Sequence, residues 1–294
     1  MGVIVILVSI GILLEKKGVV DSLTSKKLSA IVVDVCNPAL IMASILSGNI
    51  TATHEDLITA GILGFCFYLL LIILGFLLPL ILRSAPDKRK FYNLMTVYTN
   101  TGFLGIPIAK AILPDNAIIY VIVINIFYSV LFYTHGISVL SGKKGRIELK
   151  NIINPGIIMA VLSLVVFWFR LTPPPIIANT IQYTGNATIF ISMALLGVNI
   201  SRSHLGESLK DIRLWVYVGL RMLLVPLAIV FVMRALKFDD ISIQAMCLMA
   251  AVPVGNLPMI QAEKNGEDTR ILSSAIALTT VVSIATIPLL LSLL

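Results

Sequence analysis

The chain has 294 residues, of which 58% are hydrophobic and only 13% are charged, and its formal net charge is +7. Soluble domains carry about 25% charged residues, so this composition excludes a water-soluble globular protein and indicates a membrane protein with many spans. The sequence contains no nucleotide-binding loop, zinc motif or nucleophile elbow, and its three cysteines lie far apart in apolar stretches. We therefore expect no enzyme activity, no metal and no cofactor, and we attribute the excess of basic residues to membrane topology rather than to nucleic-acid binding.

Ten apolar runs follow one another along the chain, and each is a candidate membrane span. Their ranges are 1–14, 28–46, 57–82, 91–113, 116–140, 153–170, 176–200, 214–233, 241–262 and 271–293. The first run is short, because a helix needs about 20 apolar residues to cross a bilayer. The predicted fold is an all-α polytopic membrane protein with ten transmembrane helices.

The loops between these runs differ in their basic residues. Of the 22 Lys and Arg residues, 17 lie in or beside the first, third, fifth, seventh and ninth loops, and 4 lie in or beside the other four. Cytoplasmic loops carry the excess of positive charge in membrane proteins. We therefore expect a multi-pass protein of the cell membrane, with the odd-numbered loops in the cytoplasm and both termini outside.

The most polar linker near the midpoint, 141–152, divides the chain into segments 1–140 and 153–294, each with five predicted spans. An odd number of spans makes the second segment enter the membrane from the opposite side. Any repeat of the first segment in the second must therefore be inverted.

Two pairs of residues support a repeat of about 150 residues. Asn37 and Asn186 are 149 residues apart in spans two and seven, and Pro107 and Pro258 are 151 apart in spans four and nine. The agreement predicts two inverted five-helix repeats.

Span four is interrupted by the run Asn100-Thr-Gly-Phe-Leu-Gly-Ile-Pro107. A helix in lipid must satisfy its own backbone hydrogen bonds, and Pro107 both lacks an N–H and clashes with the carbonyl of residue 103. We expect one helix to end near Tyr98 and a new one to begin near Ile106, where free N–H groups and the helix dipole suit a carboxylate. The residues expected to form this half of a binding site are Thr99, Asn100, Thr101, Gly102, Gly105 and Pro107.

A second interruption lies in span nine, between Pro253 and Pro258, and includes Gly255 and Asn256. Paired interruptions at matching places in two halves point to the substrate site of a transporter. Two half-helix N-termini that meet near the midplane would form an anion site, to which all four of these residues are assigned. The alternative is a pair of proline kinks that only shape helix packing.

Two further polar residues lie deep within the predicted spans. Arg221 lies about eight residues into span eight, where a charge either faces a cavity or a partner, such as Asp34 or Glu263, or extends to the cytoplasmic interface. Asn125 in span five lies one helical turn from Ser129, and the two either line the same cavity or bond to other helices. We include Asn125 in the candidate binding site and Arg221 as a candidate charge partner.

The dipeptide Asn37-Pro38 predicts a kink in span two, with Asn37 in an extended conformation. His54 and His135 are isolated near span ends, so neither is expected to bind a metal.

Three motifs are shared with a known family. They are Asn37-Pro-Ala-Leu40, the run from Asn100 to Pro107, and Val252-Pro-Val-Gly-Asn-Leu-Pro258. With them, the whole chain resembles the auxin efflux carrier family, which includes plant PIN-FORMED carriers and bacterial malonate or malate permeases. The short form without a large central loop is similar to the prokaryotic members.

The resemblance implies a fold similar to that of the bile acid:sodium symporters. Spans one, two, six and seven would form a scaffold, and spans three to five and eight to ten a transport domain that moves as an elevator. Spans four and nine would cross at their breaks, with Asn100 as a substrate ligand shaped by Pro107 and Pro258, in a homodimer. Plant carriers place an acidic residue in span three, whereas Leu57 to Leu82 contains no carboxylate here, which argues against carrying over a proton-linked mechanism.

We therefore expect a secondary active transporter of small organic anions, such as malate, malonate or auxin-like acids, in a lipid bilayer. One alternative is a sodium-coupled symporter, with oxygen ligands for the ion from Thr99, Thr101, Gln261 and Glu263. Another is a membrane-embedded anion receptor or sensor without transport. The substrate, the direction of transport and the coupling ion are left open by the sequence.

Overall fold

The computed structural model describes residues 2–46, 50–141, 153–202 and 211–294, and within them the chain is helical without β-strands. The central linker predicted at 141–152 lies outside these ranges except for its first residue. The helices of the first segment are α1 (Gly2–Lys16), α2 (Ser22–Ile31), α3 (Asn37–Leu46), α4 (His54–Ile81), α5 (Arg89–Val97), α6 (Ile106–Ile112), α7 (Ala117–Leu131) and α8 (Ile137–Ser141). Those of the second are α9 (Pro155–Trp168), α10 (Pro175–Arg202), α12 (Ile212–Gly219), α13 (Val225–Ala235), α14 (Asp240–Ala251), α15 (Leu257–Lys264) and α16 (Arg270–Ser292).

Several helical stretches are long and apolar enough to cross a membrane. Six reach at least 18 residues: Ser22–Leu46, His54–Ile81, Ala117–Leu140, Pro175–Arg202, Ile212–Ala235 and Arg270–Ser292. Large apolar side chains on α4, such as Ile62 and Phe65, are 60% and 58% exposed, as expected for a surface that faces lipid. The prediction of an all-helical, multi-pass membrane protein is confirmed.

Proline residues within the long helices are preceded by a π-helical turn at three places. A π turn bonds each N–H to the carbonyl five residues earlier, so it displaces the carbonyl with which a proline ring would otherwise collide. Each of the three turns ends two residues before a proline: Val32–Cys36 before Pro38, Thr101–Gly105 before Pro107, and Leu220–Leu224 before Pro226.

The expectation that Asn37 is extended is wrong. Its φ of −67° and ψ of −44° are helical, because the π turn before it relieves the clash that normally excludes this conformation before proline. Ser22 to Leu46 is therefore one continuous helical stretch.

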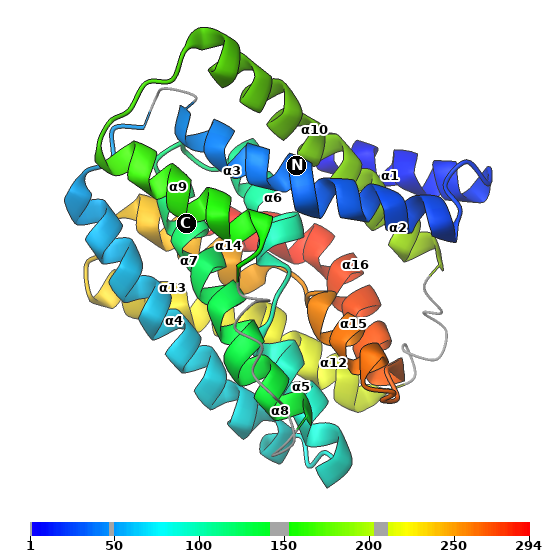
Figure 1. The fold of residues 1–294 in the computed structure, drawn as a ribbon. Coiled ribbons are helices and arrows are strands. Elements are labelled where there is room, and N and C mark those ends of the chain that lie inside the picture. The colour runs from blue at the N-terminus through cyan, green and yellow to red at the C-terminus, as the bar shows by residue number, and fades with distance from the viewer. Residues whose placement is uncertain (1, 47–49, 142–152, 203–210) are drawn as a thin grey trace.

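One group of helices packs around α1 and α10, with α2, α3 and α9 beside them (Figure 1). Two glycines bring α1 and α10 into backbone contact: a Cβ atom on Gly11 would lie 1.9 Å from the carbonyl oxygen of Ala194, and one on Gly197 2.0 Å from that of Val8. Small residues of this kind let membrane helices approach closely. Further along α10, Gly185 approaches the backbone of α3, where a Cβ atom would lie 2.8 Å from the Cα of Leu40.

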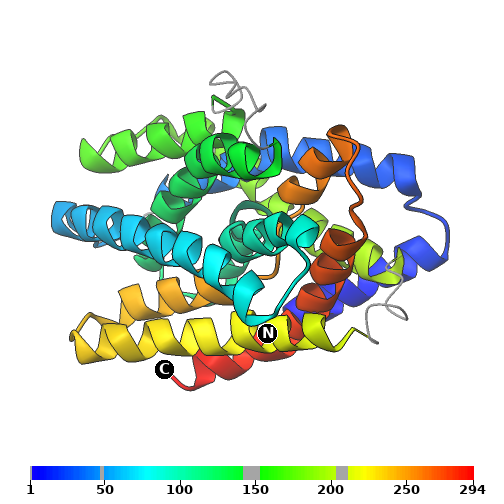
Figure 2. The ribbon, with the colours of Figure 1, turned by 90° about the horizontal axis from the view of Figure 1, so that it is seen from below.

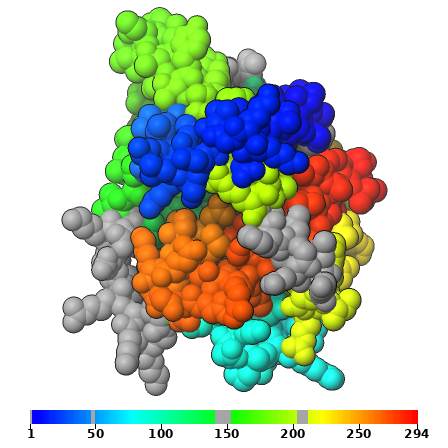
Figure 3. Space-filling view, turned by 90° about the vertical axis from the view of Figure 1, so that its right-hand side faces the viewer, coloured from blue at the N-terminus to red at the C-terminus, as the bar shows by residue number. Residues whose placement is uncertain are grey.

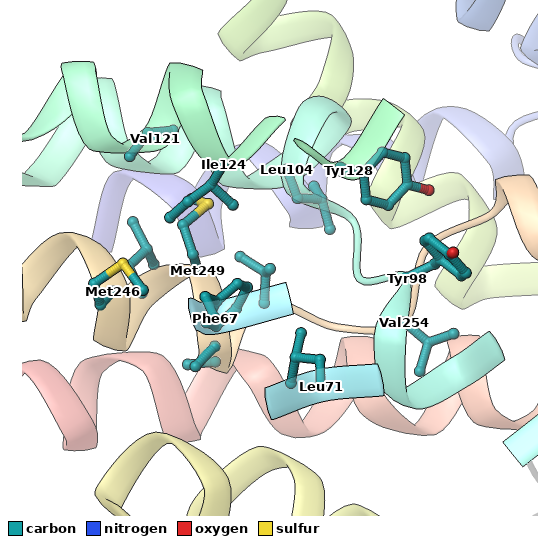
Figure 4. Close-up of a cluster of buried hydrophobic side chains, with 14 of the residues drawn as sticks. Phe67, Leu71, Tyr98, Leu104, Val121, Ile124, Tyr128, Met246, Met249 and Val254 are labelled. Atoms are coloured by element: carbon teal, nitrogen blue, oxygen red, sulfur yellow. The ribbon is translucent and has the colours of Figure 1, made fainter. Parts of the chain in front are cut away.

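The remaining helices form a second group, seen from below in Figure 2, in which α4 packs on α5 and α7, and α14 packs on α7, α13 and α16. Its buried apolar core surrounds the two places where helices break. Figure 4 shows Phe67 and Leu71 of α4, Ile124 of α7 and Met249 of α14 around the segments that carry Tyr98 and Val254. The breaks are thus enclosed by packed apolar side chains rather than exposed to lipid.

Candidate functional site

The two helix breaks meet in a short antiparallel bridge. The backbone N–H of Asn100 donates to the carbonyl of Pro253 (2.8 Å), and that of Gly255 donates to the carbonyl of Tyr98 (3.0 Å). Each break thereby satisfies polar groups that the other leaves free, as an apolar surrounding requires. The expected contact between the two interrupted segments is therefore observed directly.

The first break is shorter than predicted. Helix α5 ends at Val97, and the chain becomes helical again at Thr101, through the π turn that leads into α6. Only residues 98–100 are non-helical. The α-helix α6 begins at Ile106, as predicted, but the π turn before it makes the chain helical from Thr101, so the first N–H groups of this half-helix lie at Thr101 rather than at Ile106. The π turn explains the difference: Gly105 N–H bonds to Asn100 O (2.9 Å), and the turn accommodates Pro107 inside the helix.

The second break follows the end of α14 at Ala251, where Val252 is extended with ψ 146°. Helix α15 begins after Asn256, and Pro258 lies in its first turn. A proline there costs little, because the first N–H groups of a helix have no intrahelical partner. The N–H of Val254 is satisfied by the hydroxyl of Thr279 on α16 (3.1 Å), a residue that the sequence did not single out.

Gly255 allows the two breaks to approach. A Cβ atom there would lie 3.0 Å from the carbonyl oxygen of Tyr98 and 3.1 Å from that of Thr99. At Gly105, by contrast, the nearest atom is the flexible end of Met249, at 2.8 Å. At the crossing point itself, a side chain in place of Gly255 would therefore press against a second backbone, which is less able to move aside than a methionine side chain.

Asn125 supports the helical turn that follows the first break. Its side-chain oxygen accepts a hydrogen bond from the hydroxyl of Thr101 (3.2 Å), and a Cβ atom on Gly102 would lie 3.0 Å from the same oxygen. Asn37 also reaches this place, since its amide nitrogen lies 3.6 Å from that Cβ position. Of the two interpretations of Asn125, bonding between helices is the one observed.

A cavity of about 280 Å³ lies beside the crossing. Asn100 and Asn256, each at the N-cap of the half-helix that follows its break, both line it. The other lining residues are Ser29, Phe103, Leu196, Asn199, Ile200, Arg202, Met259, Ile260, Ser273, Ile276, Ala277 and Thr280. The remaining residues predicted for the site, Thr99, Thr101, Gly102, Gly105, Pro107, Asn125, Pro253, Gly255 and Pro258, are not among the residues that line this cavity; several of them shape the crossing instead.

Arg202, which lines this cavity, was read from the sequence only as a topology residue. It lies in the last turn of α10, donates to the carbonyl of Val20 and has its Nε 3.6 Å from Glu15 Oε1. A usable signal existed, because Asn199 and Arg202 are three residues apart and so share one helix face. Figure 3 shows the end of α10 (yellow-green) close to α15 (orange) on this side of the molecule.

Arg221 is fully buried and bonds to main-chain oxygens. Its Nε donates to the carbonyl of Thr96 (3.1 Å) and its Nη1 to that of Ala250 (2.6 Å). Asp34 and Glu263, the partners considered from the sequence, are both exposed, and within the described residues neither pairs with it. The expectation that Arg221 faces the cavity, a carboxylate or the interface is therefore corrected.

The sequence suggested that His135 is isolated, but its Nδ1 lies 2.8 Å from the hydroxyl of Tyr98 at the end of α5. Among the residues that the structure describes, no three His, Cys, Asp or Glu side chains gather to form a metal site.

Comparison with known proteins places these features in a family. The model of the family described as "Membrane transport protein" matches residues 1–151 and 145–291. A protein of Methanothermobacter thermautotrophicus named an uncharacterized transporter is 25% identical over 290 residues, which cover 97% of this chain and 94% of the relative. A second uncharacterized transporter, from Methanocaldococcus jannaschii, is 24% identical over 301 residues, covering 98% and 95% respectively.

Proposed function

Because the chain belongs to the membrane transport protein family, the family of the auxin efflux carriers, we propose that it is a secondary active transporter of small organic anions. The observation that carries the proposal is the position of Asn100 and Asn256, which line one cavity at the starts of two half-helices. A helix start offers N–H donors and a partial positive charge. The two starts therefore favour an anion at this place.

The charge of the cavity agrees with this choice. Among the described residues that line the cavity, Arg202 is the one charged residue, and no acidic residue lines it. Asn199, Ser273 and Thr280 add neutral hydrogen-bonding groups, while Phe103 and Met259 add apolar surface. A carboxylate on a short carbon skeleton matches this combination.

The size of the cavity favours small substrates. Its volume of about 280 Å³ equals that of roughly nine water molecules at about 30 Å³ each. A four-carbon dicarboxylate such as malate fits this volume, and so does malonate.

The architecture we propose has ten spans in two inverted five-helix repeats, with α1, α2, α3, α9 and α10 as the scaffold and the other helices as the transport domain. The cavity supports this division, because α2 and α10 line one side of it and the breaks, α15 and α16 the other. Sliding of the second group along the first would carry Asn100 and Asn256 across the membrane, as in an elevator.

From the loop charges we infer that the start of α2 and the end of α10 lie on the cytoplasmic side. Since Ser29 and Arg202 line the cavity there, we assign this conformation to the inward-facing state. We further propose a homodimer in the cell membrane with both termini outside.

Flux measurements test the proposal. The purified protein is reconstituted into vesicles loaded with unlabelled malate, malonate or indole acetate, and counterflow of the labelled acid is measured. Asn100→Ala and Asn256→Ala are each expected to lower affinity about 10- to 100-fold, since a hydrogen bond to a charged group contributes about 1.5–3 kcal/mol. Asn179→Ala, on the exposed first turns of α10, is the matched control and leaves flux unchanged.

The outcomes separate the alternatives. Saturable binding without counterflow assigns the protein to the receptor class instead of the carriers. Unchanged affinity in both Asn100→Ala and Asn256→Ala shows that the breaks only shape packing and that the substrate binds elsewhere.

A further inference from the structure

We propose that Arg221 is a fixed cation that neutralises the C-terminal ends of both broken helices, occupying the place of a bound metal cation, so that transport needs no sodium. The statement about transport rests on the proposed function. The role of Arg221 in the crossing does not depend on it.

The two acceptors of Arg221 occupy equivalent places in the two breaks. Thr96 lies one residue before the end of α5, and Ala250 one residue before the end of α14. The last carbonyls of a helix have no intrahelical partner. One guanidinium therefore binds one free carbonyl from each half-helix.

The charges of the two helix ends and of the guanidinium are opposite in sign and similar in size. Each helix C-terminus carries about −0.5 elementary charge, so two of them together carry about −1. Arg221 supplies +1 between them. The N-terminal ends on the other side of the crossing keep their positive character for the anion cavity, which Arg221 does not line.

The burial of Arg221 makes this compensation necessary. The side chain is 0% exposed, and an unpaired charge in the membrane interior is very costly. Within the described residues, the ion pairs of the protein join other side chains. The main-chain carbonyls are thus its principal counter-charge.

The helix-end carbonyls that would otherwise attract a cation are already engaged. The carbonyls of Thr96 and Ala250 accept from Arg221. A covalently attached cation cannot leave during the transport cycle, so it stabilises the crossing without coupling transport to an ion gradient.

The first test uses the unmodified protein. Its melting temperature, substrate affinity and counterflow are measured in sodium, potassium and N-methylglucamine salts of equal ionic strength. The substrate affinity and the counterflow rate are expected to agree within twofold among the three salts, and the melting temperature is expected to be the same in all of them. A tenfold loss of affinity or flux without sodium overturns the proposal.

The second test compares Arg221→Lys with Arg221→Met. Lysine keeps the charge, so this variant is expected to fold, to retain at least a tenth of the flux and to remain independent of sodium. Arg221→Met keeps most of the volume without the charge and is expected to lose stability and flux. Equal behaviour of the two variants shows that charge is not the function of Arg221.

The third test is rescue of Arg221→Ala by millimolar guanidinium ion, read as a rise in melting temperature and in substrate affinity. Arg234→Ala is the matched control, because Arg234 also donates to carbonyls at a helix C-terminus, those of Leu293 and Leu294, but at an exposed site. Rescue confined to Arg221→Ala supports the proposal, and a response equal to that of Arg234→Ala contradicts it.

If no tested anion is transported by the unmodified protein in any salt, the proposed function fails. The proposal for Arg221 is still decided by the melting temperatures, because Arg221→Lys and the guanidinium rescue are read without substrate. If Arg221→Ala cannot be purified, the comparison of lysine with methionine and the sodium series decide the question.

Discussion

Replacing Gly255 by alanine is expected to disrupt the contact between the two helix breaks. The added Cβ would lie 3.0 Å from the carbonyl oxygen of Tyr98 and 3.1 Å from that of Thr99. The described glycines with positive φ are Gly18 and Gly266, so the backbone conformation of Gly255 itself suits alanine. The substitution therefore tests how closely the two backbones approach, without adding strain in the backbone conformation of residue 255.

The size of the effect follows from the hydrogen bonds of the bridge. Ordinary contact requires the backbones to separate by about 0.4 Å, which stretches the Gly255–Tyr98 bond from 3.0 Å beyond the usual limit of about 3.2 Å. A buried backbone group left without a partner costs about 1–3 kcal/mol. We expect a loss of this size in stability and, because Asn256 is the next residue, reduced substrate affinity.

The measurement is thermal unfolding and counterflow of Gly255→Ala beside Gly61→Ala. Gly61 lies in α4 with no atom within 4 Å of its Cβ position, so alanine there is neutral or stabilising by up to about 1 kcal/mol. Equal melting temperatures and fluxes in the two variants refute the reasoning about the crossing.

Two further variants test other parts of the structure. Gly197→Val is expected to separate α1 from α10, since even a Cβ atom would lie 2.0 Å from Val8 O; it should lower the melting temperature by more than Gly255→Ala does, and an unchanged value contradicts the close helix contact. Arg202→Gln removes the one charged residue among the described residues that line the cavity; it should raise the KM for a dicarboxylate about tenfold with little change in melting temperature, and an unchanged KM removes Arg202 from the site.

The class of the protein and the places of its breaks could be predicted from local features. A chain with 13% charged residues cannot cover itself with a water-exposed surface. Asn, Gly and Pro at high density within an apolar run mark places where a helix is disturbed, because they act on the backbone of their own segment. Asn100 and Asn256, the two predicted residues that line the cavity, belong to these interruptions.

The edges of the breaks could not be predicted in this way. Pro107 and Asn37 were expected to require non-helical backbone, yet both lie in continuous helix beyond a π turn. The choice between a π turn and a break depends on whether neighbouring segments satisfy the freed groups. Pro253 and Gly255 supply those partners for residues 98–100, and nothing equivalent is needed near Pro107.

The partners of charged residues were decided by the tertiary structure alone. Arg221 bonds to Thr96, 125 residues away, and to Ala250, 29 residues away, and both acceptors are main-chain oxygens that no side-chain pattern marks. Arg202 reaches the cavity because α10 packs beside the crossing. The sequence by itself determined that the chain is an all-helical membrane protein interrupted at two places, since composition and helix breaking are local properties. Which interrupted ends meet, and which buried cation neutralises them, only the packing of distant segments could decide.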